Sequence, residues 1–319
     1  MIIMSSENLN EIFFPHHNQQ LKRAEEEEIN YAHYTNADTA YKIIKNQEIW
    51  LRKVTVMNDY REFEHGKDSL IKIIDDTNEG KSFREIFDSI APNVFDIAYA
   101  KFKQWGDYIK DDFYISCFSE HRQEEDKLGK LSMWRAYGGH AGVAIIFNRD
   151  FFRNSHQGLS FSSVIYTCQI KGELIKEITR LGNSILSQKD NVKSTQYNLL
   201  ENYLFNVFRF AALCNKHQGF EEEKEWRLIA TASLLPEGNL TTKEIVTIQG
   251  APQNIVKINL ENADFGNLKF KDMIDKIIIG PSERPDEIRE SIIYALKDIG
   301  AENPEAMVNM SDIPLRINH

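Results

Sequence analysis

The first structure that the hydrophobic pattern predicts is a strand, a helix and a second strand between residues 31 and 52. Residues 31–35 are typical of a strand, and Thr35 and Asn36 are residue types that begin helices. Apolar side chains then recur at helical spacing over residues 37–44, and residues 48–52 again have strand character. We therefore expect the ordered part of the chain to open as strand-helix-strand.

Helical and strand patterns alternate along the rest of the chain. Helical spacing of apolar residues predicts helices over 65–105, 174–185 and 197–213, and a helix that begins at Pro285. Period-two patterns or short apolar runs predict strands over 112–119, 142–147, 163–166, 225–230, 255–260 and 274–281. Strands at both ends with helices between them predict an α+β fold with a mixed, mainly antiparallel central sheet and a helical insert near 170–215.

The distribution of apolar residues also suggests where the α+β domain begins. Residues 1–30 carry an acidic run and little periodic apolar pattern, so we expect a charged N-terminal tail or helix there. Residues 31–319 contain no Gly/Ser/Pro-rich linker, so a single α+β domain is favoured over two.

Composition and charge narrow the function classes. The 319 residues include 38 Lys and Arg against 48 Asp and Glu, a formal net charge of −10. Basic residues are scattered, which argues against broad nucleic-acid binding but leaves room for a nucleotide-sized pocket lined by Arg227 and Lys216. No apolar stretch approaches the roughly 20 residues of a membrane-spanning helix, and residues 1–4 are too short for the core of an export signal. We expect a cytoplasmic protein without membrane contact.

Several common motifs are missing from the sequence. It contains no Gly-x-Gly-x-x-Gly, no Gly-x-Ser-x-Gly and no His-Glu-x-x-His, the signatures of dinucleotide-binding domains, many hydrolases and zinc proteases. Cys117, Cys168 and Cys214 are too few and too widely spaced for a disulfide framework or a four-thiolate zinc site. Cys214 and His217 supply half a metal site without a second pair, so we predict no metal centre.

Candidate site residues gather at the ends of predicted strands, where side chains are held rigidly yet remain open. His33, Tyr34 and Thr35 end the first strand. The histidine and tyrosine are suited to hold a ligand. The histidine could equally cap the next helix or form a hydrogen bond to the backbone. Ser116 and Ser119 lie in the strand over 112–119.

Two further clusters leave alternatives open. Asn58 and Asp59 follow the second strand and form either a turn or part of a polar site. Trp134 and Tyr137, three residues apart, either wall a pocket or seal the core.

The acidic run of residues 221–225 leads directly into a strand. We expect residues 221–223 to be a solvated face. Glu225 differs, because period two places Glu225 and Arg227 on one face of the strand and Trp226 and Leu228 on the other. This carboxylate and guanidinium either pair structurally or line a cleft.

The order of these pieces resembles a known family, the bacterial domain-of-unknown-function family 2971. The resemblance extends over residues 31–316 and rests on His33-Tyr34-Thr35, Trp50-Leu51, Asn58-Asp59 with Glu62, Ser116-Cys117-Phe118-Ser119, Met133-Trp134 with Tyr137, Gly142-Val143, Lys216 with Phe220, Glu225-Trp226-Arg227-Leu228-Ile229, Ile277-Ile278-Ile279-Gly280-Pro281 and Ser311-Asp312-Ile313-Pro314-Leu315-Arg316. It implies no activity.

A second resemblance is to the ADP-ribosyltransferase fold, whose enzymes carry a His or Arg on an early strand, a Ser-x-Ser or Tyr element on a middle strand and a Glu on a late strand. His33, the serines of 116–119 and Glu225 occur in that order, although one residue more separates the serines, and Glu223-x-Glu225 looks like the two-glutamate variant. The resemblance implies NAD as a substrate, with Glu225 stabilising the oxocarbenium-like transition state. It implies catalytic roles for Glu225, His33 and Ser119, and NAD contacts from His33, Tyr34, Thr35, Asn58, Ser116, Trp134, Tyr137 and Arg227.

Three functions follow as hypotheses. The first is an ADP-ribosyltransferase-like enzyme of bacterial stress or phage defence, a toxin or effector that modifies a protein or nucleic-acid acceptor and is held by an antitoxin partner. The second is a non-catalytic module that senses a small nucleotide ligand or binds a protein. The third is a metal-dependent nuclease or hydrolase built on Asp59, Glu62 and Glu225. The sequence alone leaves open whether the protein is an enzyme.

Overall fold

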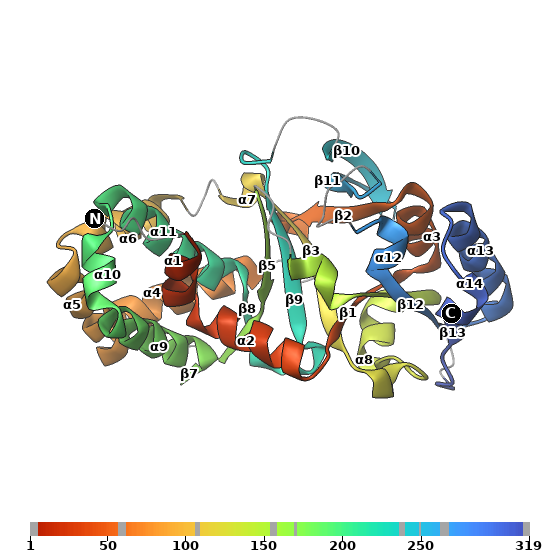
Figure 1. Cartoon of the computed structure of the whole chain (residues 1–319), viewed down its shortest axis with the longest axis horizontal. Helices are drawn as coiled ribbons and strands as arrows, with labels where there is room; N and C mark the ends of the chain where they lie inside the picture. The colour runs from red at the N-terminus through yellow and green to blue at the C-terminus, as the bar shows by residue number, and fades with distance from the viewer. Residues whose placement is uncertain are drawn as a thin grey trace. The chain divides into compact units, whose positions relative to one another are not determined.

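The computed structural model describes residues 6–56, 62–105, 109–153, 158–168, 171–235, 240–248, 250–261 and 268–314. The chain forms two compact units, each made of segments far apart in the sequence (Figure 1). The first contains residues 1–23, 55–111 and 163–221, and we call it the helical unit. The second contains residues 24–54, 112–162 and 222–319, and we call it the sheet unit. The domain boundaries expected from the sequence, 1–30 and 31–319, stay a prediction.

The helical unit is built mainly from helices that enclose aromatic side chains. Its elements are α1 (Ser6–Phe13), α2 (Pro15–Glu26), η1 (Val54–Val56), α4 (Glu62–Asp76), α5 (Asn78–Ile90), α6 (Val94–Trp105), α7 (Ile109–Asp112), α9 (Glu173–Ser187), α10 (Lys189–Ser194), α11 (Tyr197–Leu213) and η5 (Gln218–Glu223), with strands β6 (Ile165–Cys168), β7 (Lys171–Gly172) and β8 (Asn215–His217). The Phe95 ring lies 5.5 Å from Phe83 and 5.6 Å from Phe208 between centroids. The predicted insert therefore packs against the helices predicted over 65–105.

The sheet unit contains most of the strands. Its elements are β1 (Asn30–Asn36), α3 (Ala37–Asn46), β2 (Glu48–Lys53), β3 (Phe113–His121), η2 (Gln123–Glu125), α8 (Leu131–Met133), η3 (Trp134–Gly138), β4 (Ala141–Phe147), η4 (Arg149–Arg153), β5 (Leu159–Ser163), β9 (Glu225–Thr231), β10 (Thr241–Ile248), β11 (Ala251–Asn259), α12 (Phe270–Met273), β12 (Ile274–Ser282), α13 (Pro285–Asp298), α14 (Pro304–Met307) and β13 (Val308–Met310).

Ten strands of the described chain form one sheet in the order β10-β11-β2-β3-β1-β4-β12-β13, with β9 between β3 and β5. Among the pairs whose register is described in this sheet, β12 and β13 run parallel and the others antiparallel. The predicted α+β fold with a mainly antiparallel sheet is therefore confirmed.

Local rules explain why the first elements form where they do. The Asn36 side chain accepts a hydrogen bond from the Thr39 N–H at 2.9 Å and so begins α3. Pro285 occupies the first turn of α13, where its missing N–H costs nothing.

Two expectations need correction. The predicted strand over 163–166 is two separate strands, because β5 ends at Ser163 and β6 begins at Ile165 and pairs with β8 in the helical unit. Of the tail or helix expected at the N-terminus, the structure has helices, α1 and α2, but they are not wholly exposed: Leu9, Ile12 and Phe13 are buried because they face the apolar interior of the unit.

The sheet branches at β3, which positions the candidate site. On one edge of β3, β9 pairs with residues 113–119. On the other edge, β1 pairs with residues 119–121 and β2 with residues 114 and 115. The ladder on this edge therefore has a gap opposite residues 116–118, between the diverging strands β1 and β2.

The two faces of the sheet carry different cores. One face packs against α3, α12 and α13 and includes Tyr31, Phe118, Trp226 and Leu228. The other face carries a smaller cluster in which Trp134 packs against β1, β4 and β12.

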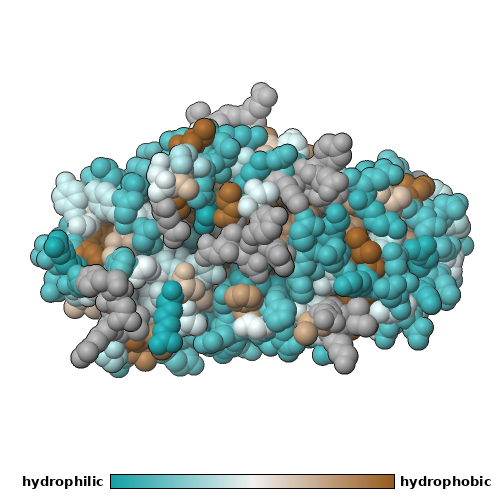
Figure 2. All heavy atoms as spheres, turned by 180° about the vertical axis from the view of Figure 1, so that it is seen from behind, coloured by the Kyte–Doolittle hydropathy of each residue, from teal (hydrophilic) through white to brown (hydrophobic). Residues whose placement is uncertain are grey.

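Within the described ranges, no helix is long and apolar enough to cross a membrane. Figure 2 shows hydrophobic residues as separate spots on a largely hydrophilic face.

Candidate functional site

Strands β3 and β9 bring two predicted catalytic residues side by side. Ser119 and Glu225 are cross-strand partners, and Cys117 pairs with Arg227 two residues further along. Cross-strand partners share a face, so Ser119, Glu225 and Arg227 all lie opposite the core that contains Trp226 and Leu228.

Glu225 and Arg227 form a buried ion pair. The Arg227 Nε–H donates to Glu225 Oε1 at 2.6 Å, and the two residues are only 4% and 3% exposed. Taking two charges out of water is costly, and an apolar pair of the same volume is often as stable. The pair is thus a buried structural pair, the first of the two alternatives that the sequence left open.

Ser119 is completely buried and its hydroxyl is fully engaged. It donates to the Glu223 backbone carbonyl at 2.5 Å and accepts from Lys130 Nζ at 2.9 Å. Lys130 Nζ also donates to the Glu120 carbonyl at 2.6 Å. Burial lowers the pKa of Lys130, and the nearby carboxylates of Glu125 and Glu120 oppose that shift.

Glu223 departs from the expected solvated acidic run. Glu221 and Glu222 are exposed, as predicted, but Glu223 is buried. Its carboxylate accepts a hydrogen bond from the Tyr137 hydroxyl, 3.3 Å from Oε2 and 3.4 Å from Oε1. This contact ties η3 to Glu223, which belongs to the sheet unit, and Glu223 is buried.

His33 lies in the gap of the β3 ladder. Its Nδ1 is 2.9 Å from the Cys117 carbonyl oxygen, and because a carbonyl only accepts, Nδ1 carries the proton. Burial lowers the pKa of His33, so the neutral ring presents Nε2 as an acceptor. His33 pairs with Ile145, a member of the larger core, so its ring and Ser119 lie on opposite sides of the sheet.

Tyr34 and Trp134 pack against each other. Their ring centroids are 4.8 Å apart in an edge-to-face arrangement, and the Tyr34 hydroxyl accepts from the Lys130 N–H at 3.0 Å. Burial raises the pKa of Tyr34. Trp134 is 2% exposed, and its indole N–H donates to the Leu128 carbonyl at 2.8 Å. A Cβ on Gly280 would lie 2.7 Å from this indole, so the glycine is needed for the ring to fit. Of the two alternatives left open, Trp134 seals the core.

The remaining predicted site residues are spread along the chain. Thr35 is half-buried and pairs with Val143 on β4. Ser116 is buried on β3, and its Oγ has no hydrogen-bond partner within the part of the chain that the structure describes. Asn58 and Asp59 lie outside the described residues.

The metal-dependent hydrolase stays a hypothesis, because Asp59, one of its three carboxylates, lies outside the described residues. Among the described residues, no group of three or more His, Cys, Asp or Glu side chains is placed to hold a metal ion. In the helical unit, Glu62 pairs with Lys216 at 3.1 Å, and Lys216 also lies over the Phe220 ring at 4.8 Å.

Sequence reasoning missed Lys130 and Arg52. Lys130 contacts Ser119 only because the chain folds back between β3 and η3, and no local pattern signals it. Arg52 pairs with Ile115, which places it on the same face as Cys117 and Arg227. Burial lowers the pKa of Arg52, and the neighbouring Cys117 thiol opposes the shift. The alternation of side chains along β2 could have indicated which face of the sheet Arg52 lies on, but not which residues surround it.

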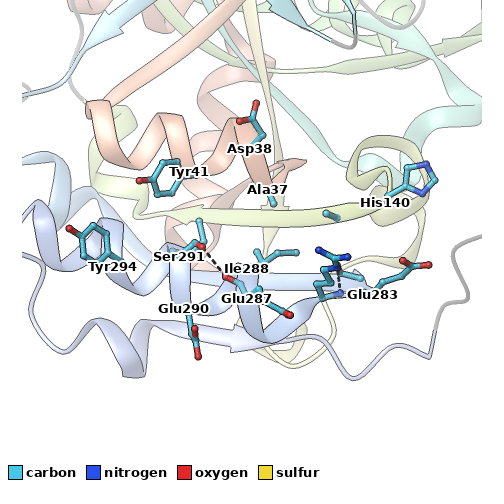
Figure 3. A pocket seen from close by; sticks show the side chains of 14 residues that line it. Ala37, Asp38, Tyr41, His140, Glu283, Glu287, Ile288, Glu290, Ser291 and Tyr294 are labelled. Atoms are coloured by element: carbon cyan, nitrogen blue, oxygen red, sulfur yellow. Dashed lines mark hydrogen bonds between the residues drawn. The ribbon is translucent and has the colours of Figure 1, made fainter.

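Two cavities lie elsewhere on the sheet unit. One of about 790 Å³ runs between α3 and α13 (Figure 3). The other, about 630 Å³, is lined by charged residues around His121 and Lys276. Neither is lined by a predicted site residue.

Comparison with known proteins finds a family model that matches part of the chain. Residues 133–228 match the model of a family described as a protein of unknown function, DUF2971, which confirms the resemblance over that segment. No curated protein and no solved structure matches the chain.

Proposed function

Because the matching family carries no described function, we propose one from the geometry of the sheet unit: it is an ADP-ribosyltransferase-like enzyme that uses NAD. The observation that carries the proposal is the cross-strand pair of Ser119 and Glu225, with Arg227 on the same face. His33 is bonded to the same strand at Cys117, but its ring lies on the opposite side of the sheet from Ser119, so the proposal gives it no contact with NAD at Glu225.

The proposed reaction moves ADP-ribose from nicotinamide to an acceptor. The bond between C1′ of the ribose and the nicotinamide nitrogen breaks, and its electron pair leaves with neutral nicotinamide. Glu225 stabilises the cationic sugar that develops, as a carboxylate does in glycoside hydrolysis. An acceptor hydroxyl then bonds to C1′ and gives its proton to Glu225 or to water.

The other polar side chains have positioning roles in this proposal. Arg227 attracts the diphosphate while it orients Glu225. Lys130 holds the Ser119 hydroxyl in place. Ser119 and Glu225 are both buried, so the residues that shield them from solvent must move before NAD can bind.

Release of nicotinamide from NAD tests the proposal. Glu225→Gln removes the negative charge and keeps the shape, so nicotinamide release should fall by about 100-fold or more. Glu222→Gln is the matched control, since Glu222 is an exposed carboxylate on the preceding turn and should leave the rate unchanged. Near-ultraviolet circular dichroism checks that both variants fold. Absence of NAD binding and of nicotinamide release by the wild type, with and without cell lysate as a source of acceptor, would refute the proposal.

The non-catalytic alternative has an observation of its own. Ser119 and Glu225 already have protein partners and are buried, which suits a structural pair beneath a nucleotide-sensing or protein-binding surface. In that case NAD or another nucleotide binds without nicotinamide release, and Glu225→Gln leaves binding unchanged.

In the cell, we place this activity in the cytoplasm, as a toxin or effector of bacterial stress or phage defence restrained by a protein partner. Overexpression of the wild type in a bacterial host should slow growth, and Glu225→Gln should abolish the effect while Glu222→Gln retains it. Equal growth with wild type and Glu225→Gln would contradict a toxin that acts through this site.

A further inference from the structure

A groove runs between α3 and α13 on the sheet unit, and none of the residues predicted to contact NAD lines it. It has a volume of about 790 Å³. Its apolar and aromatic lining, which we call the floor, includes Ala37 and Tyr41 on α3 and Ile288 on α13 (Figure 3), together with the buried Ile292. Tyr294, 67% exposed, extends the apolar surface along α13. Large apolar side chains that remain open to solvent in a groove favour a partner that covers them.

The rim of the groove is acidic. Asp38, Glu283, Glu287 and Glu290 line it, against Arg284 as its one arginine or lysine. Asp38 is already neutralised by Lys42 at 2.7 Å. Glu287 and Glu290 are exposed on successive turns of α13 and have no ion-pair partner among the residues that the structure describes. The α13 side of the groove therefore offers negative charge to an incoming group.

Charge decides which kind of partner fits. Nucleic-acid phosphates and anionic lipid headgroups are repelled by Glu287 and Glu290. A helix with Leu-type side chains on one face and Lys or Arg beside them matches both features, since apolar side chains cover the floor and cations meet the rim. Helix-in-groove docking of this kind uses apolar anchors at helical spacing on the incoming helix.

We propose that the groove between α3 and α13 docks a basic amphipathic helix of a partner protein. The groove shares no lining residue with the site around Ser119 and Glu225, so the proposal is independent of NAD chemistry.

A labelled peptide tests the proposal on the full chain. The probe is an amphipathic Lys/Leu helix of about 18 residues, five helical turns, and binding is followed by fluorescence anisotropy at near-physiological salt. Glu287→Lys combined with Glu290→Lys should weaken binding about tenfold or more. Glu221→Lys combined with Glu222→Lys is the matched control: it makes the same change of charge at exposed positions outside the groove, and binding should change less than about twofold.

The apolar floor needs a test of its own. Tyr294→Ser alters an exposed side chain, so the protein should still fold. The substitution should weaken binding of the peptide about threefold or more. Amide hydrogen exchange should show protection by the peptide in residues 37–46 and 285–298. Equal weakening by the two charge-reversal pairs, or protection elsewhere, would mean general attraction to an acidic protein and would overturn the proposal. Binding of spermine but not of the peptide, or a dimer that Glu287→Lys dissociates, would assign the groove to a small polyamine or to a second copy instead.

Discussion

The two faces of β9 have opposite characters although they alternate along seven residues. Trp226, Leu228 and Ala230 enter the larger core, where the Trp226 ring stacks on Phe161 at 5.1 Å. Glu225 and Arg227 face the other way and pair with each other in a buried setting. One strand thus serves the fold with one face and presents buried charge with the other. Substitutions on each face should separate the two roles.

The largest loss of stability should come from a substitution on the face of β9 that packs into the core. Trp226→Ala removes the stacking on Phe161, the edge-to-face contact with Tyr31 at 5.1 Å and the indole hydrogen bond to Glu120 at 3.0 Å. We expect a loss of about 4 kcal/mol in the free energy of unfolding, as for other buried tryptophans, measured by urea denaturation with circular dichroism. Tyr294→Ala, at an exposed aromatic, is the control and should cost less than about 0.5 kcal/mol. Similar losses for both would mean that Trp226 does not anchor the core.

On the polar face of β9, the loss of stability should depend on whether one or both charges of the Glu225–Arg227 pair are removed. Arg227→Met leaves the Glu225 carboxylate buried without its guanidinium, and we expect a loss of about 3 kcal/mol in stability. Adding Glu225→Leu to that variant removes the uncompensated charge, so the double variant should lose less than about 1 kcal/mol. Denaturation of both single variants and the double variant completes the cycle. If the losses simply add, the two side chains do not interact energetically.

The sequence predicted the elements that depend on neighbours in the chain. The ends of β1 and α3 lie within two residues of those predicted, and Asn36 begins α3 as expected. Alternation and helix capping depend only on residues within about one turn, so the sequence reveals them. The alternation of Glu225, Trp226, Arg227 and Leu228 likewise needed only the geometry of a strand.

Contacts between distant segments lay beyond that local information. The break between β5 and β6 at Val164 arises because the two strands find partners in β9 and in β8, which no local pattern specifies. The bond from Lys130 to Ser119 depends on the return of the chain after β3. Whether Trp134 faced a ligand or the core was decided by Gly280, nearly 150 residues away in the sequence.

His33, at the gap beside β3, should make the stability of the folded protein depend on pH. Burial holds its pKa in the folded protein below the ordinary value of about 6.5, so the unfolded chain binds the proton more readily. Stability from neutral His33 is therefore complete above pH about 6.5 and is lost as pH falls below it. His33→Asn keeps a donor for the Cys117 carbonyl but does not titrate. The cost of this substitution in unfolding experiments should shrink from pH 8 to pH 5, and a constant cost would contradict a depressed pKa.

The smallest expected effect concerns Tyr34, one residue further along β1 and on the opposite face from His33. Tyr34→Phe keeps the edge-to-face contact with Trp134 but removes the oxygen that accepts the Lys130 N–H at 3.0 Å. The unpaired donor should cost about 1 kcal/mol in stability, measured by urea denaturation, whereas Tyr294→Phe at the exposed α13 site should change nothing measurable. Because Lys130 also holds Ser119, loosening its backbone should lower nicotinamide release if Ser119 positions NAD. Reduced stability with full activity would instead confine Tyr34 and Lys130 to the fold, and would leave Glu225 and Arg227 as the polar face on which the proposed chemistry depends.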